Sequence, residues 1–162
     1  MIYLPKIQWP TLMIVIMVIA TACGGGNKEG SQFAPPQKTE PKKVTFEDAT
    51  ANWKDYKGIG PVTSVELGEL DQGLANAGKE IFDMKCFACH ETGMDKVGPD
   101  PVGVLNRRTP EWIMNMILNP EQMSKEDPIG LGLLMKYNSI MANQQLTEED
   151  ARKVLEYFRT LN

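Results

Sequence analysis

Histidine is nearly absent from this chain: His90 is the only histidine in 162 residues. Cysteine is scarce as well, with three residues in total, and only Cys86 and Cys89 lie close together. A structural zinc site takes four ligands, usually as two separated pairs of cysteines or histidines. The sequence offers one such pair and one neighbouring histidine, which argues against a closed zinc site.

The chain also lacks an excess of basic residues, the alternating pattern of strands and long apolar runs. The net charge of −4 gives no reason to expect binding to nucleic acid. The run LMIVIMVIA at residues 12–20 is about half of the roughly 20 residues that a membrane-spanning helix needs. From residue 71 onward the alternation typical of strands is missing, and this favours an all-α fold.

Residues 1–22 are predicted to be a signal peptide, because Lys6 precedes the apolar run and small residues follow it. The sequence Ala20-Thr21-Ala22-Cys23 resembles a bacterial lipobox, which implies that Cys23 is lipidated and becomes the mature N-terminus. The alternative is ordinary cleavage near Ala22, which leaves a free thiol. We therefore expect an exported, periplasmic protein that a lipid at Cys23 anchors to a membrane.

The mature chain divides into three parts by composition. Residues 23–50 are rich in Gly, Pro, Lys and Glu and poor in apolar residues, so a flexible linker is predicted there. Residues 51–70 carry aromatic and aliphatic residues without a helical period, which predicts an extended strap on the surface of the domain. Residues 71–162 form the predicted helical domain.

Four helices are expected in that domain. One begins near Asp71 and runs into Cys86, with apolar residues three and four apart. A second is capped by Thr109 and ends before Pro120, and a third begins at Pro128. The last has Thr147 as its N-cap, close to a capping box, and carries an apolar stripe to residue 161.

The segment Cys86-Phe87-Ala88-Cys89-His90 has the spacing of a covalent haem attachment site. Each thiol adds to one vinyl group of the haem, and the imidazole becomes an axial ligand of the iron. Four alternatives remain for this short motif: zinc, a thioredoxin-like redox pair, a structural disulfide, which is geometrically awkward across so short a loop, or a chance match. No strand-rich run precedes Cys86, which weighs against the redox pair.

A methionine thioether is the expected second axial ligand, because no second histidine is available. Met141 is preferred, since it lies in a polar loop just before the last helix. Met123, also placed in a loop, and Met135 are the alternatives. The other methionines of the domain flank the motif or lie in helices, where methionine usually fills gaps in the core; these are Met84, Met94, Met114 and Met116.

Residues 71–162 resemble class I mono-haem cytochrome c, because residues typical of that family occur here in the same order along the chain. The matching residues are Gly78 and Phe82, the CFACH segment at 86–90, Gly98-Pro99, Arg107, Arg108, Trp112, Asn119-Pro120, Met141, Leu146-Thr147 and Tyr157. The chain departs from the family in having Ala142 after the methionine and Pro101 in the loop after Gly98.

The resemblance implies a small helical domain wrapped around one covalent haem c. Cys86 and Cys89 would hold the haem, His90 and Met141 would ligate the iron, and the Pro99 carbonyl would accept a hydrogen bond from His90. Gly78 would let the first helix cross over Tyr157. Arg107, Arg108 and Trp112 would meet the haem propionates, or else be solvated charges and a core indole.

The resulting functional prediction is a monomeric electron carrier of a respiratory chain and not an enzyme. It would exchange one electron with donor and acceptor proteins, because both axial positions are filled and substrate has no place at the iron. Two alternatives are a haem enzyme or gas sensor with a labile sixth ligand, and a fixed cytochrome subunit of an oxidase or denitrification complex.

Overall fold

The computed structural model describes residues 43–161. Within this range the chain forms six α-helices and two short 3-10 helices, and its only β pairing is an isolated bridge between Glu91 and Met94. The predicted all-α fold is confirmed. The expected signal peptide at 1–22, Cys23 and the expected linker up to residue 42 lie outside the described residues. In residues 43–161 no helix has the length and apolarity that crossing a membrane requires.

The linker expected at 23–50 is wrong over its last residues, which form helix α1 (Phe46–Ala51). Thr45 caps this helix by accepting a hydrogen bond of 3.1 Å from the Asp48 N–H. Ala49 is buried, and the Phe46 ring lies so close to Gly132 that a Cβ there would overlap it. Tertiary packing therefore stabilises a helix too short to be recognised from periodicity.

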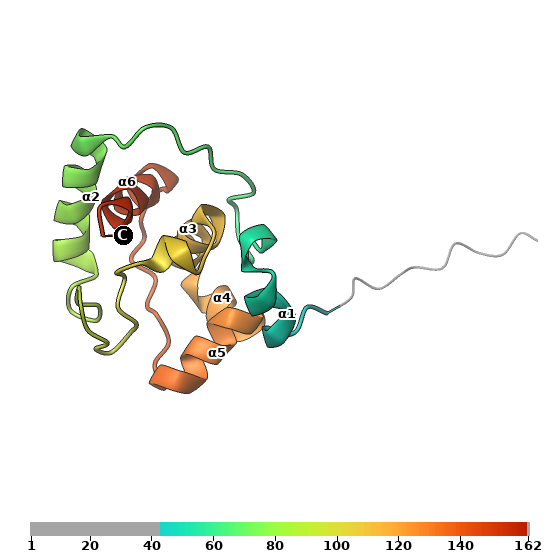
Figure 1. Ribbon diagram of the computed structural model, residues 1–162. Coiled ribbons are helices and arrows are strands. Elements are labelled where there is room, and N and C mark those ends of the chain that lie inside the picture. The colour runs from blue at the N-terminus through green and yellow to red at the C-terminus, as the bar shows by residue number, and fades with distance from the viewer. Residues whose placement is uncertain (1–42, 162) are drawn as a thin grey trace, which may run out of the picture. The chain divides into compact units, whose positions relative to one another are not determined.

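After α1 comes the 3-10 helix η1 (Trp53–Asp55), and residues 56–71 then cross the top of the molecule without a regular element (Figure 1). The extended strap expected at residues 51–70 therefore begins only at residue 56, and we call residues 56–70 the strap. The side-chain amide of Asn115 binds the backbone of the strap at Val62. Its Oδ1 accepts from the Val62 N–H at 2.9 Å, and its Nδ2 donates to the Val62 carbonyl at 2.9 Å. At the far end of the strap Arg152 and Arg159 donate to the carbonyls of Glu66 and Gly68.

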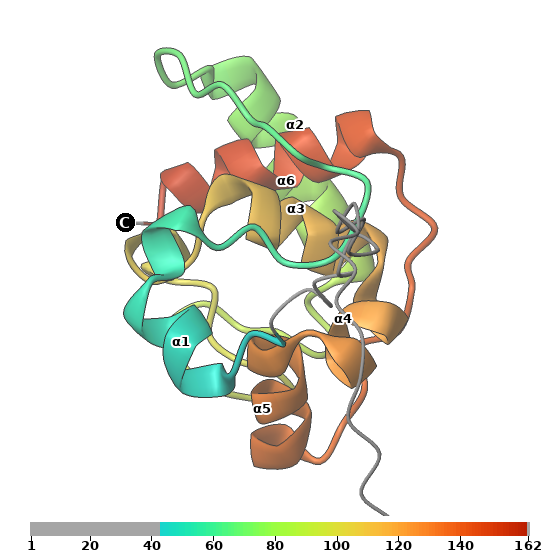
Figure 2. The same ribbon diagram turned by 90° about the vertical axis from the view of Figure 1, so that its right-hand side faces the viewer.

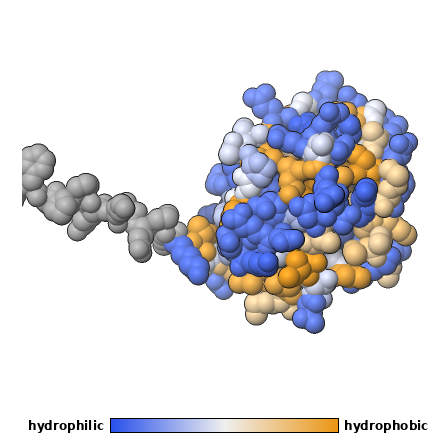
Figure 3. Space-filling view, turned by 180° about the vertical axis from the view of Figure 1, so that it is seen from behind, coloured by the Kyte–Doolittle hydropathy of each residue, from blue (hydrophilic) through white to orange (hydrophobic). Residues whose placement is uncertain are grey.

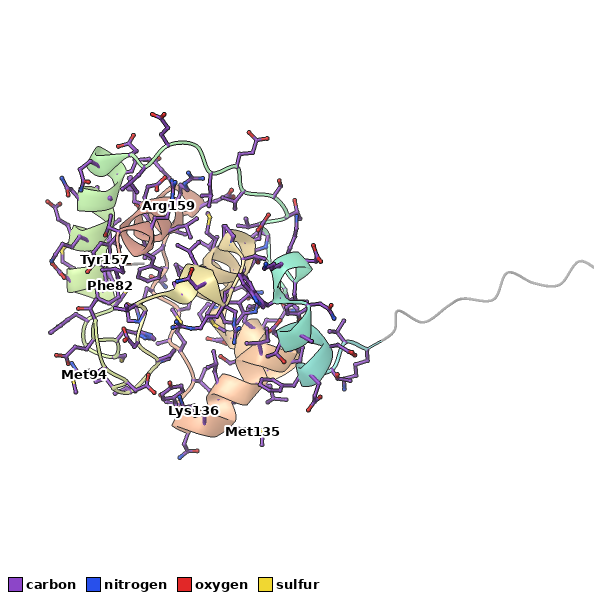
Figure 4. All side chains as sticks on the ribbon, viewed as in Figure 1. Phe82, Met94, Met135, Lys136, Tyr157 and Arg159 are labelled. Carbon is purple, nitrogen blue, oxygen red and sulfur yellow. The ribbon has the colours of Figure 1, made fainter. Side chains whose placement is uncertain are left out.

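Helices α2 (Gln72–Lys85) and α6 (Glu148–Arg159) make the most extensive helix contact. Gly78 lets them approach, because a Cβ there would overlap the Lys153 carbonyl. The resemblance implied that Gly78 crosses over Tyr157. In the structure Gly78 instead lies against Lys153, one turn before Tyr157 in α6. Tyr157 instead packs on Phe82, with ring centroids 5.5 Å apart, between the two helices (Figure 4).

Three helices, each with proline at its start, complete the domain: α3 (Pro110–Leu118), α4 (Pro120–Glu126) and α5 (Pro128–Tyr137). Figure 2 shows α4 and α5 below α3 and α6. The sequence did not predict α4, whose seven residues were expected to be a loop. A short 3-10 helix η2 (Val104–Asn106) precedes α3. On the rear face, hydrophobic groups gather in patches between hydrophilic ones (Figure 3).

Candidate functional site

The CFACH segment turns tightly where α2 ends. Cys86 caps the helix by donating to the Phe82 carbonyl at 2.8 Å, and the N–H groups of Cys89 and His90 both donate to the Cys86 carbonyl, at 3.0 and 2.9 Å. This turn brings both thiols and the imidazole to one cavity. Cys86 and Cys89 form no disulfide with each other.

The His90 ring is fixed from two sides. Its Nδ1 lies 2.9 Å from the Pro99 carbonyl, which is the contact that the resemblance implies. Since a carbonyl can only accept, Nδ1 carries the proton and Nε2 keeps its lone pair for a metal. A Cβ on Gly98 would overlap the imidazole, so this position has no room for a side chain.

The Cys86 thiol has the opposite character from a redox-active cysteine. Burial, with a smaller contribution from Cys89, raises the pKa of Cys86 to about 11. The reactive cysteines of disulfide oxidoreductases have lowered pKa values. The environment therefore disfavours the thioredoxin-like alternative.

All eight residues predicted for the site line a single cavity. They come from the end of α2, the loop after it, the residues before and within α3, and the loop after α5; they are Cys86, Cys89, His90, Pro99, Arg107, Arg108, Trp112 and Met141. Hydrophobic side chains complete the lining, including Phe82, Ile113, Ile117, Leu133 and Phe158.

The cavity separates the candidate methionines. Among the described residues, only Met116 and Met141 line it. Met123 is wholly buried in α4, where its sulfur lies 3.1 Å from the Ile59 N–H, and Met135 is 77% exposed and points away from the domain (Figure 4). Met123 is thus a core residue of a helix and not a loop residue, and Met141 remains the predicted ligand.

Arg107, Arg108 and Trp112 are held by protein groups. Arg107 donates to the carbonyls of Asp100 and Val102, at 2.6 and 2.8 Å. The Arg108 guanidinium lies 5.2 Å from the centroid of the Trp112 ring.

The one N–H of the Trp112 indole donates to Asp127 Oδ1 at 3.2 Å. An indole has no second donor, so Trp112 cannot also hydrogen-bond a propionate in this arrangement. Asp127 itself was not singled out from the sequence, although an aspartate before Pro128 is a recognisable helix N-cap.

A polar latch joins the loop after the CFACH segment to the end of α5, and it was not predicted from the sequence. Asp95 accepts from the Tyr137 hydroxyl at 2.7 Å and from Lys136 at 3.0 Å, and its other oxygen accepts from the Asp100 N–H at 3.0 Å. These bonds, led by the one from the Asp100 backbone, lower the pKa of Asp95 to about 2. Tyr137 ends α5 and lies four residues before Met141.

The residues present suit a haem. Two thiols suited to thioether bonds, an imidazole with Nε2 available and a thioether in a second loop surround a cavity that is largely apolar. No cluster of three or more His, Cys, Asp or Glu side chains within residues 43–161 is arranged to hold a metal ion directly.

Comparison with known proteins agrees. The family model for cytochrome c matches residues 75–162. The cytochrome c of Rhodothermus marinus is 41% identical, covers 63% of this chain and 89% of its own, and superposes with a TM-score of 0.62. An engineered form of it is 40% identical, covers 63% of this chain and 90% of its own, and has a TM-score of 0.61.

A search of curated proteins gives no match. The family match extends over more than half of the sequence and includes every residue predicted for the site. The chain therefore belongs to the cytochrome c family, whose members carry covalently attached haem c.

Proposed function

We propose that this protein is a class I, mono-haem electron carrier that is exported to the periplasm and anchored to a membrane by a lipid on Cys23. It exchanges one electron with donor and acceptor proteins of a respiratory chain, acts as a monomer and is not an enzyme. The observation that carries the proposal is the single cavity that His90 and Met141 both line.

The chain's own residues have three tasks in this function. Cys86 and Cys89 hold the haem, which supplies the one-electron redox couple. His90 is held in one tautomer by Pro99 and provides Nε2, while Met141 provides a thioether. The apolar lining, including Phe82 and the residues of α3, excludes water and so limits solvation of charge in the site.

The test uses the full chain, expressed in a bacterial host that attaches haem c. We expect haem that stays bound after denaturing extraction, a low-spin spectrum in both oxidation states and a reversible one-electron titration. The protein should fractionate with membranes, and Cys23→Ser should release it with its spectrum unchanged.

The matched control is the double variant Cys86→Ala, Cys89→Ala, which should lose the covalent haem but not the membrane anchor. Extractable haem in the unaltered protein would overturn the attachment. A membrane association that Cys23→Ser leaves intact would overturn the lipid anchor.

One observation favours a second candidate, a haem enzyme or gas sensor with a labile sixth ligand. None of the backbone–backbone hydrogen bonds of the described residues involves residues 139–146, the loop that carries Met141. The engineered Rhodothermus marinus cytochrome c has been solved bound to a carbene intermediate. Rapid binding of carbon monoxide by the reduced, folded protein would favour this candidate over the carrier.

A further inference from the structure

Asp127 is a carboxylate with no exposed surface that lies directly behind the haem cavity. Its Oδ1 accepts from the Trp112 indole at 3.2 Å and from the Gly130 N–H at 2.8 Å. Its Oδ2 accepts from the Tyr56 hydroxyl at 2.6 Å. Trp112 and Gly130 both line the cavity, so the carboxylate is separated from the cavity by residues that it contacts.

Tyr56 belongs to the strap and lies outside residues 75–162, the part of the chain that matches the family. The Thr109 hydroxyl donates to its carbonyl at 2.8 Å, which fixes the backbone next to the start of α3. Burial, followed by the hydrogen bond to Asp127, raises the pKa of Tyr56. The hydroxyl therefore keeps its proton at neutral pH and donates a hydrogen bond to Asp127.

A fixed charge in this position affects the redox equilibrium of a haem. Oxidation adds positive charge at the iron, and a nearby negative charge in a medium of low dielectric stabilises the oxidised form. One cation, Arg108, lies over the Trp112 ring and interacts electrostatically with Asp127. Hydrogen bonds that a carboxylate accepts reduce the field it exerts, so each donor moderates the effect.

We propose that Asp127 lowers the reduction potential of the haem through its charge, and that Tyr56 is a positioning residue of the strap that holds this carboxylate and moderates its field. The inference rests on the proposed one-electron role of the haem, but not on the lipid anchor or on the identity of the partners.

The variant Asp127→Asn tests the charge, because it keeps the hydrogen bonds. The amide Oδ1 still accepts from Trp112 and Gly130, asparagine remains a good N-cap for α5, and the amide nitrogen donates to the Tyr56 hydroxyl. In the haem-loaded full chain we expect a higher reduction potential. The ratio of oxidised to reduced protein at a fixed ambient potential should fall severalfold.

The variant Tyr56→Phe tests the positioning residue. It removes one donor and leaves the charge, so we expect a smaller shift in the opposite direction, to a lower potential. In the Asp127→Asn background the same substitution should have no effect. A purely structural role, in which either change loosens the strap and admits water, would instead shift both variants in the same direction.

Glu111→Gln is the matched control, since Glu111, which lies in α3, is a buried carboxylate like Asp127 and also contacts the strap. It accepts from the Val65 N–H at 3.1 Å and lies 3.3 Å from Lys57 Nζ, but neither it nor these partners line the cavity. A shift in Asp127→Asn no larger than in Glu111→Gln overturns the charge effect. An unchanged potential in Tyr56→Phe overturns the role of Tyr56.

The unaltered protein is measured first, so that the two proposals fail separately. If it shows no reversible one-electron couple, the carrier function is wrong. If it shows one and the variants do not shift it as described, only the inference about Asp127 and Tyr56 is wrong.

Discussion

Two regions border the haem cavity, and they are built in different ways. The first, residues 86–101, which we call the attachment wall, is crossed by backbone bonds such as Gly98 N–H to Cys89 and Lys96 N–H to Gly98, both 2.9 Å. The second, residues 138–147, which we call the methionine loop, has no regular element and is held mainly at its ends. At one end Asn138 ends α5 in a left-handed conformation, and at the other Thr147 caps α6.

The difference teaches that the two residues proposed as axial ligands, His90 and Met141, are secured by different means. His90 is held by residues close to it in the sequence, through the Pro99 carbonyl and the turn at Cys86. These contacts within the protein fix the imidazole without any contribution from the haem. Met141 has no such local support, so the iron bond itself would stabilise the loop. The first ligand should be permanent and the second exchangeable.

The largest expected effect comes from Met141→Ala. We expect complete loss of the thioether-to-iron charge-transfer absorption of the oxidised protein and a lower reduction potential, because His/Met ligation raises the potential. The covalent haem should remain, since the attachment wall is unaltered. Visible spectra and a redox titration measure both properties.

Two other methionines give the controls for that experiment. Met116→Leu alters the second methionine of the cavity, and Met135→Ala alters an exposed one. Both should keep the charge-transfer absorption. If Met116→Leu abolishes it and Met141→Ala does not, the loop does not supply the ligand.

A smaller effect is expected from Gly98→Ala in the attachment wall. The added methyl group would overlap the His90 ring, and overpacking of this kind costs about 1–3 kcal/mol of unfolding free energy. Denaturant unfolding followed by circular dichroism measures the loss. Gly68→Ala, where a Cβ meets nothing within 4 Å, is the control and should change little. Equal stabilities of the two variants would contradict a rigid wall.

The smallest effect concerns the latch, in which Asp95 of the attachment wall accepts hydrogen bonds from Tyr137 and Lys136 at the end of α5, directly before the methionine loop. We expect Asp95→Asn to make the methionine loop easier to open. A lower denaturant concentration should then remove the charge-transfer absorption at neutral pH. Because Asp95 and Lys136 are exposed, the change should be modest. Glu80→Gln, on the exposed face of α2, should leave that concentration unaltered.

The latch should also depend on pH in a defined window. The pKa of Asp95 is about 2 in the folded protein against an ordinary value of 3.8, so folding favours the charged form. Its contribution is therefore complete above about pH 4 and is lost as the pH falls toward 2. The difference between the unaltered protein and Asp95→Asn should shrink steadily over that range, and a difference as large at pH 2 as at neutral pH would contradict this assignment.

Local signals in the sequence predicted much of this structure. Thr109 before Pro110, Pro128, and Thr147 with Asp150 placed the starts of three helices, because caps act within a few residues. The eight residues chosen for the site all reached one cavity, since the motif and the family resemblance fix their order along the chain. Their individual roles remain predictions.

What the sequence did not reveal depends on partners far apart in the chain. Tyr56 and Asp127 are 71 positions apart, and no periodicity connects them. The sequence left two roles open for the Trp112 indole, a propionate partner or a core residue, because it does not reveal the buried Asp127 to which the indole donates. Helices α1 and α4 are six and seven residues long, too short for an amphipathic pattern to be recognised, and they depend on tertiary packing.

The strap has a consequence for where this domain can be cut. The family pattern begins at residue 75, but a fragment that began there would leave the Asn115 amide and Asp127 Oδ2 without their partners. Each buried polar group left unsatisfied costs about 1–3 kcal/mol, a large share of the roughly 5–15 kcal/mol that stabilises a typical domain. Gene fusions or chimaeras that transplant this cytochrome should therefore place their N-terminal boundary before Thr45. The segment that matches the family is shorter than the segment that must be transferred intact for the domain to fold.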